Sequence, residues 1–203
     1  MKKLIQLIVS TICMLIIIIS IPACSSKMHS STNGQSSSNM GMSTQSSSST
    51  TSMQQHASAV LSGSFPDTTV TGTAQFDAQA DGKVKMHLQI SIPAKANKSV
   101  AVHLHAMGDC GDMGKAAGGH WNPTNAQHGK WGSASFHSGD IGNVALDAQG
   151  NGSMELETNL WTLGGDASTN ILNKTVMVHG GTDDYTSQPS GNAGTRIGCG
   201  IIK

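Results

Sequence analysis

From about residue 58 onward the chain contains short stretches in which apolar and polar residues alternate. In residues 83–92 every second side chain is apolar, and lysine, histidine and glutamine fill most positions between. Because successive side chains of a strand point to opposite faces, this pattern predicts a half-buried strand with His87 on its solvent side. Residues 70–77 form a partner stretch, and Asp81-Gly82 between the two favours a hairpin turn.

Four further stretches fit the same period, at residues 100–107, 141–147, 153–158 and 175–179. Turn-forming residues separate them, as in the sequence DAQGNG at 147–152, and this part of the chain has no convincing helical period. Seven or eight short strands of this kind predict an all-β fold, an antiparallel sandwich or a flattened barrel. About 145 residues is a normal size for one such domain.

The first 23 residues have the layout of a secretory signal peptide. Two lysines precede a long apolar run, which ends in Ile21-Pro22-Ala23 directly before Cys24. This resembles a bacterial lipoprotein signal, in which cleavage leaves the cysteine as a lipid-modified N-terminus. We therefore expect an exported protein that is anchored by lipid on Cys24 to the extracytoplasmic face of a bacterial membrane, at the cell surface or in the periplasm. The alternative is an uncleaved transmembrane anchor, since the run is nearly long enough to span a bilayer.

Residues 24–57 are rich in serine, methionine and glutamine and contain no aromatic or acidic residue. Such a segment cannot bury enough apolar surface to offset its ordering entropy, so we interpret it as a flexible linker before a domain at 58–203. The linker also contains soft side chains that are candidates for binding copper. They are Met28, Met40, Met42 and Met53 with His29 and His56. The simpler interpretation is polar low-complexity sequence that tolerates methionine.

Charge and cysteine content exclude some partners and indicate a compartment. Twelve basic residues balance twelve acidic ones, and no basic cluster lies beyond the N-terminus, so nucleic acid is not an expected partner. With Cys13 inside the signal and Cys24 assigned to lipid, Cys110 and Cys199 remain. In an oxidising compartment we expect them to form a disulfide, which by chain entropy would stabilise the fold by about 4–5 kcal/mol.

Five of the nine histidines lie in residues 101–140. His103 and His105 are two apart on a predicted strand, so both point to one side of it. His120, His128, His137 and Asp140 follow in a glycine-rich stretch. Nitrogen and carboxylate ligands of this kind suit zinc and copper, and the alternative is a histidine-rich loop that binds metal only incidentally. Because the stretch has little apolar content, we expect its order to come from metal and disulfide.

Several motifs within residues 57–203 resemble the copper/zinc superoxide dismutase family. They are HLH at 103–105, GGHWNP at 118–123, HG at 128–129, HSGD at 137–140, VMVHGGTDD at 176–184 and GNAGTRIGCGII at 191–202. The resemblance implies a Greek-key antiparallel sandwich or flattened barrel of about eight strands with long metal-binding loops. It implies one copper and one zinc ion, with superoxide as the substrate and a homodimer as an open question.

The resemblance also implies a role for each site residue. Copper would be held by His103, His105, His120 and His179. Zinc would be held by His120, His128, His137 and Asp140. His120 would bridge both ions, Arg196 would receive the anionic substrate beside copper, and Asp183 would link a histidine of each site. The alternative for Arg196 is an ordinary surface ion pair, and Asp184 is the alternative to Asp183.

The chain also departs from the family pattern. Ala101 stands where glycine is usual and Ala106 where an acidic residue is usual, although neither change removes a ligand. No lysine lies between Thr182 and Arg196, so charge guidance from this segment is absent, and Lys115 is a candidate substitute. We expect a superoxide dismutase whose rate depends weakly on ionic strength. The alternative function is a non-catalytic surface lipoprotein that buffers copper and zinc with the same fold.

Overall fold

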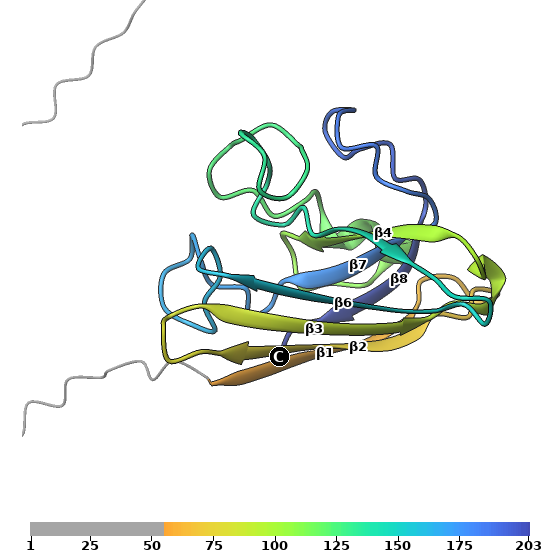
Figure 1. Ribbon diagram of the computed structural model, residues 1–203, viewed down its shortest axis with the longest axis horizontal. Coiled ribbons are helices and arrows are strands. Elements are labelled where there is room, and N and C mark those ends of the chain that lie inside the picture. Colours follow the sequence, from red (N-terminus) through yellow and green to blue (C-terminus); the bar gives the residue numbers. More distant parts are fainter. Residues whose placement is uncertain (1–54) are drawn as a thin grey trace, which may run out of the picture. The chain divides into compact units, whose positions relative to one another are not determined.

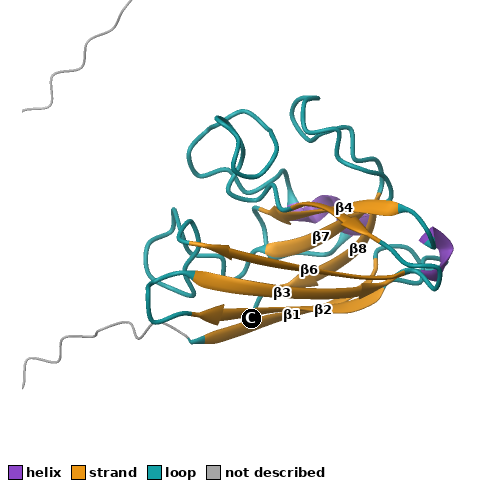
Figure 2. Cartoon of the chain, in the orientation of Figure 1, coloured by secondary structure: helices purple, strands orange, loops and turns teal. Residues whose placement is uncertain are grey.

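The computed structural model describes residues 55–203, which form eight strands and two short 3-10 helices (Figures 1 and 2). The strands are β1 His56–Gly63, β2 Thr71–Ala78, β3 Val84–Ser91, β4 Ser99–His105, β5 Gly142–Ala145, β6 Asn151–Thr158, β7 Thr175–His179 and β8 Arg196–Ile201. The 3-10 helices are η1 Pro93–Lys95 and η2 Asp112–Ala117. The predicted signal peptide, Cys24 and nearly all of the predicted linker lie outside the described residues.

All strand pairs are antiparallel, and the sheet has the order β5-β4-β7-β8-β1-β2-β3-β6. The two edge strands meet, because a Cβ added at Gly152 of β6 would lie 2.7 Å from the carbonyl oxygen of Ala145 in β5. The sheet is therefore a nearly closed barrel, which confirms the predicted all-β fold. Long loops extend beyond β4 and β7 on one side of the barrel (Figure 2).

The side chains of β3 alternate between the inside and the outside of the barrel, as predicted. Val84, Met86, Leu88 and Ile90 are buried in the core, while the intervening residues are partly or fully exposed. His87 lies on the outer face, as expected, with its Nδ1 atom 3.2 Å from a carboxylate oxygen of Glu155 on β6. The hairpin before β3 also forms where predicted, with Gly82 at a φ of 83° that glycine adopts without strain.

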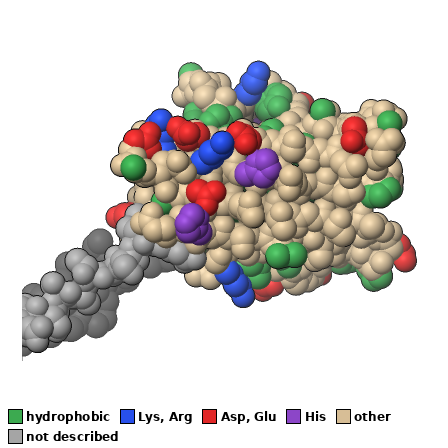
Figure 3. Space-filling model, turned by 60° about the horizontal axis from the view of Figure 1, so that its bottom comes forward, with side chains coloured by type: hydrophobic (Ala, Val, Ile, Leu, Met, Phe, Trp, Pro, Cys, Tyr) green, Lys and Arg blue, Asp and Glu red, His purple; other side chains and the backbone are tan. Residues whose placement is uncertain are grey.

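The outer face of β1, β2, β3 and β6 carries interleaved charges of both signs. Lys83 and Lys85 form ion pairs with Glu157 and Glu155 at 2.7 and 2.9 Å. Figure 3 shows histidine, acidic and basic side chains close together on the left part of the displayed face, with further charged side chains elsewhere on it. Each such exposed pair contributes little stability, but together the pairs give the sheet a charged, polar outer surface. Within the described residues, no helix is long and apolar enough to cross a membrane.

Two strands had no clear signal in the sequence. β1 begins at His56, inside the predicted linker, and its inward side chains are mostly alanines that contrast weakly with serine. In β8 the pattern is interrupted by glycines at positions where neighbouring strands approach closely. A Cβ at Gly198 would lie 2.6 Å from the Val70 side chain, and one at Gly200 would lie 2.5 Å from the Val60 carbonyl oxygen. His56 is therefore a strand residue whose ring contacts Asp77, and not a part of the linker.

Candidate metal centre

The candidate site lies outside the barrel wall, between β4 and the long loops. Val102 and Leu104 of β4 point into the core, so His103 and His105 point to the opposite side of the strand, as the H-x-H spacing predicts. Both rings are nevertheless fully buried, because loops cover this side. One of these loops runs along β4, where the Trp121 amide donates to the Leu104 carbonyl at 2.7 Å.

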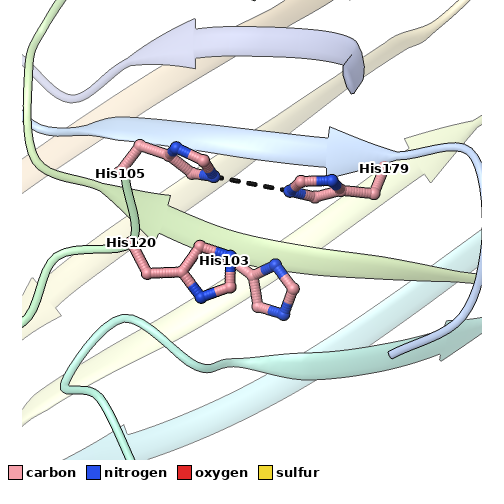
Figure 4. A group of neighbouring side chains, drawn as sticks. All are labelled: His103, His105, His120 and His179. Carbon is pink, nitrogen blue, oxygen red and sulfur yellow. Dashed lines mark hydrogen bonds between the residues drawn. The ribbon is translucent and has the colours of Figure 1, made fainter. Parts of the chain in front are cut away.

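The first ligand group, called here the four-histidine group, joins residues that are far apart in the chain. It consists of His103, His105, His120 and His179, whose facing nitrogens all lie within 4.8 Å of one another. β4 supplies two of the rings, the loop after η2 supplies the third, and the end of β7 supplies the fourth. Figure 4 shows the His105 and His179 rings directed at each other, with the other two rings beside them.

Hydrogen bonds fix which nitrogen of each ring faces the centre. His105 Nδ1 lies 2.8 Å from the Gly118 carbonyl oxygen, and His179 Nδ1 lies 3.2 Å from that of Gly194. A carbonyl oxygen only accepts, so both Nδ1 atoms carry the proton and both Nε2 atoms carry lone pairs. These Nε2 atoms are 3.4 Å apart. Two lone pairs facing each other repel, and a cation between them makes the arrangement favourable.

The second ligand group, called here the Asp140 group, consists of His120, His128, His137 and Asp140. The Nδ1 atoms of the three histidines lie 2.7, 3.0 and 3.1 Å from the carboxylate oxygens of Asp140. Tetrahedral ligands about 2.0 Å from zinc would be roughly 3.3 Å apart, so the group is close to the size that a zinc ion needs. His120 belongs to both groups.

Buried nitrogens without partners test whether metals fit here. His103 Nδ1, His120 Nε2 and His128 Nδ1 are buried and have no hydrogen bond. His128 Nδ1 is close to Asp140 but not aligned with it for a hydrogen bond. Leaving such a group unsatisfied costs about 1–3 kcal/mol. All three atoms belong to the two ligand groups, so bound metal ions would satisfy each of them, and histidine nitrogens are ligands that copper and zinc accept.

Burial keeps three histidines of the four-histidine group neutral, which leaves their lone pairs available. Burial lowers the pKa of His103 to about 4, that of His179 to about 3 and that of His105 to about 2. The pKa of the nearby Asp140 carboxylate is set differently. Burial alone would raise the pKa of Asp140, but hydrogen bonds from His120 and from two backbone amides outweigh it and hold this pKa well below its usual value. Asp140 is therefore an anion within the site.

Asp183 connects the two ligand groups. Its Oδ2 atom lies 2.9 Å from His103 Nε2, and its Oδ1 atom lies 2.9 Å from His128 Nε2. The loop after β7 closes tightly over this carboxylate at Gly191, where an added Cβ would lie only 1.8 Å from Oδ1. Asp184, in contrast, is exposed and accepts hydrogen bonds within its own turn. The geometry therefore favours Asp183 over Asp184 as the linking residue.

Arg196, at the start of β8, lies beside the four-histidine group. Its guanidinium donates to the carbonyl oxygens of Gly114 and Gly118, at 2.7 and 2.6 Å, and less closely to that of Lys115. These contacts use at most three of the five N–H groups of the side chain, so donors remain for an anion. Arg196 has no acidic partner among the described residues, and the alternative of a surface ion pair is therefore wrong.

A cavity of about 400 Å³ leads from solvent to this place. It is lined by Arg196, by small uncharged residues and by four histidines, namely His105, His120, His137 and His179. A larger hollow lies on the outer face of β1, β2 and β3, but no metal-ligating histidine lines it. The Lys115 ammonium, the suggested source of guiding charge, is exposed and lies 4.0 Å from Asp112, which offsets its charge.

The expected disulfide between Cys110 and Cys199 is present. It joins β8 to the chain just before η2, which provides carbonyl acceptors for Arg196. Sequence reasoning missed these acceptors and the carbonyls behind His105 and His179, because a backbone carbonyl has no residue-type signal. It also missed Asn143, whose side chain exchanges two hydrogen bonds with the backbone of Asp183 at 2.8 and 2.9 Å.

The fold and the two ligand groups define a β-barrel protein with two candidate metal-binding groups that share His120. A family model described as copper/zinc superoxide dismutase (SODC) matches residues 70–202. A copper/zinc superoxide dismutase of Talaromyces marneffei is 38% identical over 153 residues, covering 72% of this chain and 96% of that protein. One of Aquifex aeolicus is 36% identical over 111 residues, covering 53% and 66% respectively.

Among solved structures, the chain is similar to the clock protein EA4. The TM-score is 0.66 with 30% sequence identity, and the match covers 74% of this chain and 95% of that one. The chain belongs to the copper/zinc superoxide dismutase family. Its activity is the dismutation of superoxide, with one copper and one zinc ion as cofactors.

Proposed function

We propose that the four-histidine group holds copper, that the Asp140 group holds zinc, and that His120 bridges the two ions. The observation that carries this assignment is the arrangement of His120. Its Nδ1 atom lies 2.7 Å from Asp140, its Nε2 atom is buried without a hydrogen bond, and the residue belongs to both ligand groups. When bound, copper supplies one-electron redox chemistry and zinc supplies a fixed positive charge without redox chemistry.

The residues of the chain supply the proton and the docking site. Two superoxide anions and two protons give dioxygen and hydrogen peroxide. In this proposal His120 Nε2 accepts one proton in the first half of the cycle and delivers it to the reduced substrate in the second, while water supplies the other proton. Asp140 keeps the His120 ring oriented through Nδ1, and Asp183 does the same for His103 and His128.

Arg196 receives the substrate anion in this proposal. Its charge and its remaining N–H donors lie in the cavity that His120 and His179 also line. A fixed cation with donors in a partly buried place orients a small anion and raises its local concentration. Because the guanidinium is held by backbone carbonyls and not by a carboxylate, its positive charge is not neutralised by a neighbour.

The Arg196→Ala variant tests this role. We expect its rate of superoxide removal to fall about tenfold or more, with copper and zinc content unchanged, because an oriented donor at the reacting anion is lost. Lys115→Ala is the matched control, since it removes a nearby exposed cation, and its rate should stay close to that of the wild type. Loss of metal in Arg196→Ala would refute the docking role, because Arg196 would then be needed for metal binding.

We also propose that the protein is exported and anchored by lipid on Cys24. The lysines, the apolar run and the Ile-Pro-Ala-Cys ending at residues 21–24 support this, and the disulfide is typical of an oxidising compartment. Cells fed a labelled fatty acid should incorporate the label into the wild-type protein but not into Cys24→Ala. Equal labelling of the two proteins, or none in either, would contradict lipidation at this residue.

A further inference from the structure

The loop that carries most of the Asp140 group, residues 121–141, contains no strand and no helix. From its sequence we expected metal and disulfide to hold it in place, and the structure shows a further support that the sequence did not indicate. Three aromatic side chains tie the loop to the barrel, namely Trp131, Phe136 and Trp161. We call them the aromatic anchor. Trp131 and Phe136 belong to the loop, while Trp161 follows β6 and is fully buried in the core.

The aromatic anchor is a connected stack that reaches from the loop into the core. The Trp131 ring lies 5.1 Å from the Phe136 ring and 5.5 Å from the Trp161 ring, between centroids. Trp161 in turn meets Phe76 of β2 edge to face at 6.0 Å. Aromatic pairs at these distances contribute favourable contacts beyond the area that they bury. None of these contacts involves a metal ligand.

A hydrogen bond connects the aromatic anchor to the segment between two of the ligands, His137 and Asp140. The Trp161 Nε1–H donates to the Ser138 carbonyl oxygen at 2.8 Å, and this contact is buried. Ser138 stands between His137 and Asp140, and the next residue, Gly139, accepts a hydrogen bond at 2.8 Å from the Leu104 amide of β4. Two consecutive carbonyls between the ligands are therefore held by the barrel.

We infer that the aromatic anchor preorganises the zinc half of the centre, and that Trp161 is the positioning residue that sets His137 and Asp140. The inference rests on the proposed assignment of zinc to the Asp140 group. A loop that is already ordered loses less conformational entropy when the ion binds, so affinity is higher than for a loose loop. The protein should thus keep this loop folded before zinc arrives.

Trp161→Phe tests the positioning role, because it keeps an aromatic ring in the core but removes the N–H donor. Zinc dissociation constants from chelator competition should show about tenfold weaker binding, the lower range for groups that orient metal ligands. The visible spectrum of cobalt placed in the zinc site should also change, which reports ligand geometry. Leu61→Val, a core change on β1, is the control and should leave both readouts close to wild type.

Zinc affinity in Trp161→Phe equal to that of the wild type would overturn the inference, as would an equal loss in Leu61→Val. A second measurement uses the metal-free wild type and needs no variant. Its tryptophan emission and near-ultraviolet circular dichroism should match those of the metal-loaded protein, and strong quenching by acrylamide after metal removal would overturn the inference. If wild-type protein bound no zinc at all, the proposed metal assignment would fail instead, while the emission would still report on the anchor.

Discussion

A single buried carboxylate, Asp183, contacts a histidine of each ligand group and so makes them one unit. Burial alone would raise the pKa of Asp183, but the hydrogen bonds with His103 and His128 outweigh burial and lower it. The side chain is therefore an anion that orients two rings. Its backbone is fixed by Asn143 and its carboxylate also accepts from the Tyr185 amide at 2.7 Å. Few changes at this position can preserve all of these contacts.

Asp183→Asn should weaken zinc binding by about 10–100-fold, because an amide cannot accept from both His103 and His128. The reason lies in ring orientation, since neither histidine would be lost as a ligand. Asp184→Asn is a close control, because Asp184 is the next residue and its carboxylate accepts hydrogen bonds from Thr186 and Ser187 and not from a histidine. Chelator competition measures both affinities. Similar zinc affinity in the two variants would show that Asp183 has no orienting role.

The sequence indicated the ligands better than it indicated their supports. Histidines at i and i+2 of a strand point to one side, so the H-x-H spacing alone was enough to place His103 and His105 together. Trp161 had no such signal, because a tryptophan in an apolar stretch looks like any core residue. Its partner is the carbonyl of Ser138, and a backbone carbonyl leaves no trace in the sequence.

At the scale of elements, the disulfide links the strand that presents Arg196 to the segment that holds its guanidinium. Cys199 lies in β8 three residues after Arg196, and Cys110 lies two residues before η2. η2 and the residue after it supply the carbonyls of Gly114 and Gly118. A covalent tie at one end of this pair should therefore limit how far the guanidinium moves.

Replacing both Cys110 and Cys199 by serine should lower the free energy of unfolding by about 4–5 kcal/mol, since the bond closes a loop of 89 residues. Denaturant titration of metal-free protein measures this. The same variant, loaded with metal, should also turn over more slowly, because the acceptors of Arg196 are no longer tied to β8. A stability within 1 kcal/mol of the wild type, roughly the size of an ordinary point mutation, would contradict the first expectation.

Most strands were predictable because one face of each is buried and the other is not. β3 and β7 match the predicted stretches within a residue or so at each end. β1 and β8 were not predictable in this way, because alanine and glycine weaken the apolar contrast where strands approach closely. The long loops could be predicted only as glycine-rich stretches, since their path depends on contacts with residues distant in the chain.

For the whole molecule, the buried histidines make stability depend on pH. In the unfolded chain these rings have a pKa near 6.5. Burial lowers the folded pKa of His103 to about 4 and that of His179 to about 3. The unfolded state therefore binds more protons between pH 6.5 and 4, and protonation favours unfolding in this range. Above pH 6.5 these rings are neutral in both states and the effect vanishes.

Metal-free protein should accordingly lose stability as the pH falls from about 6.5 to about 4. The slope should be at least about 1.4 kcal/mol per pH unit, which corresponds to one proton. Urea titrations at several pH values measure it. A free energy of unfolding that stays constant or rises over this range would show that the rings protonate without cost in the folded state.

The balance of charge suggests how the rate responds to salt. The chain has a formal net charge of zero, and no lysine stands in the loop between Thr182 and Arg196. Long-range attraction of superoxide is therefore weak, and Arg196 acts mainly at short range, where salt screens little. The rate should change less than about threefold between 10 and 150 mM salt, and a steep fall would reveal a guiding charge elsewhere.

We propose that one copper and one zinc, held by two groups that share His120, make this chain a superoxide dismutase. The most direct measurement loads metal-free protein with both metals, counts the ions bound per chain, and follows superoxide decay by stopped flow. We predict one copper and one zinc per chain. The rate of superoxide decay should rise in proportion to the concentration of metal-loaded protein. Several copper ions bound through residues 28–56, with no acceleration of decay, would contradict the claim and indicate a copper-buffering protein.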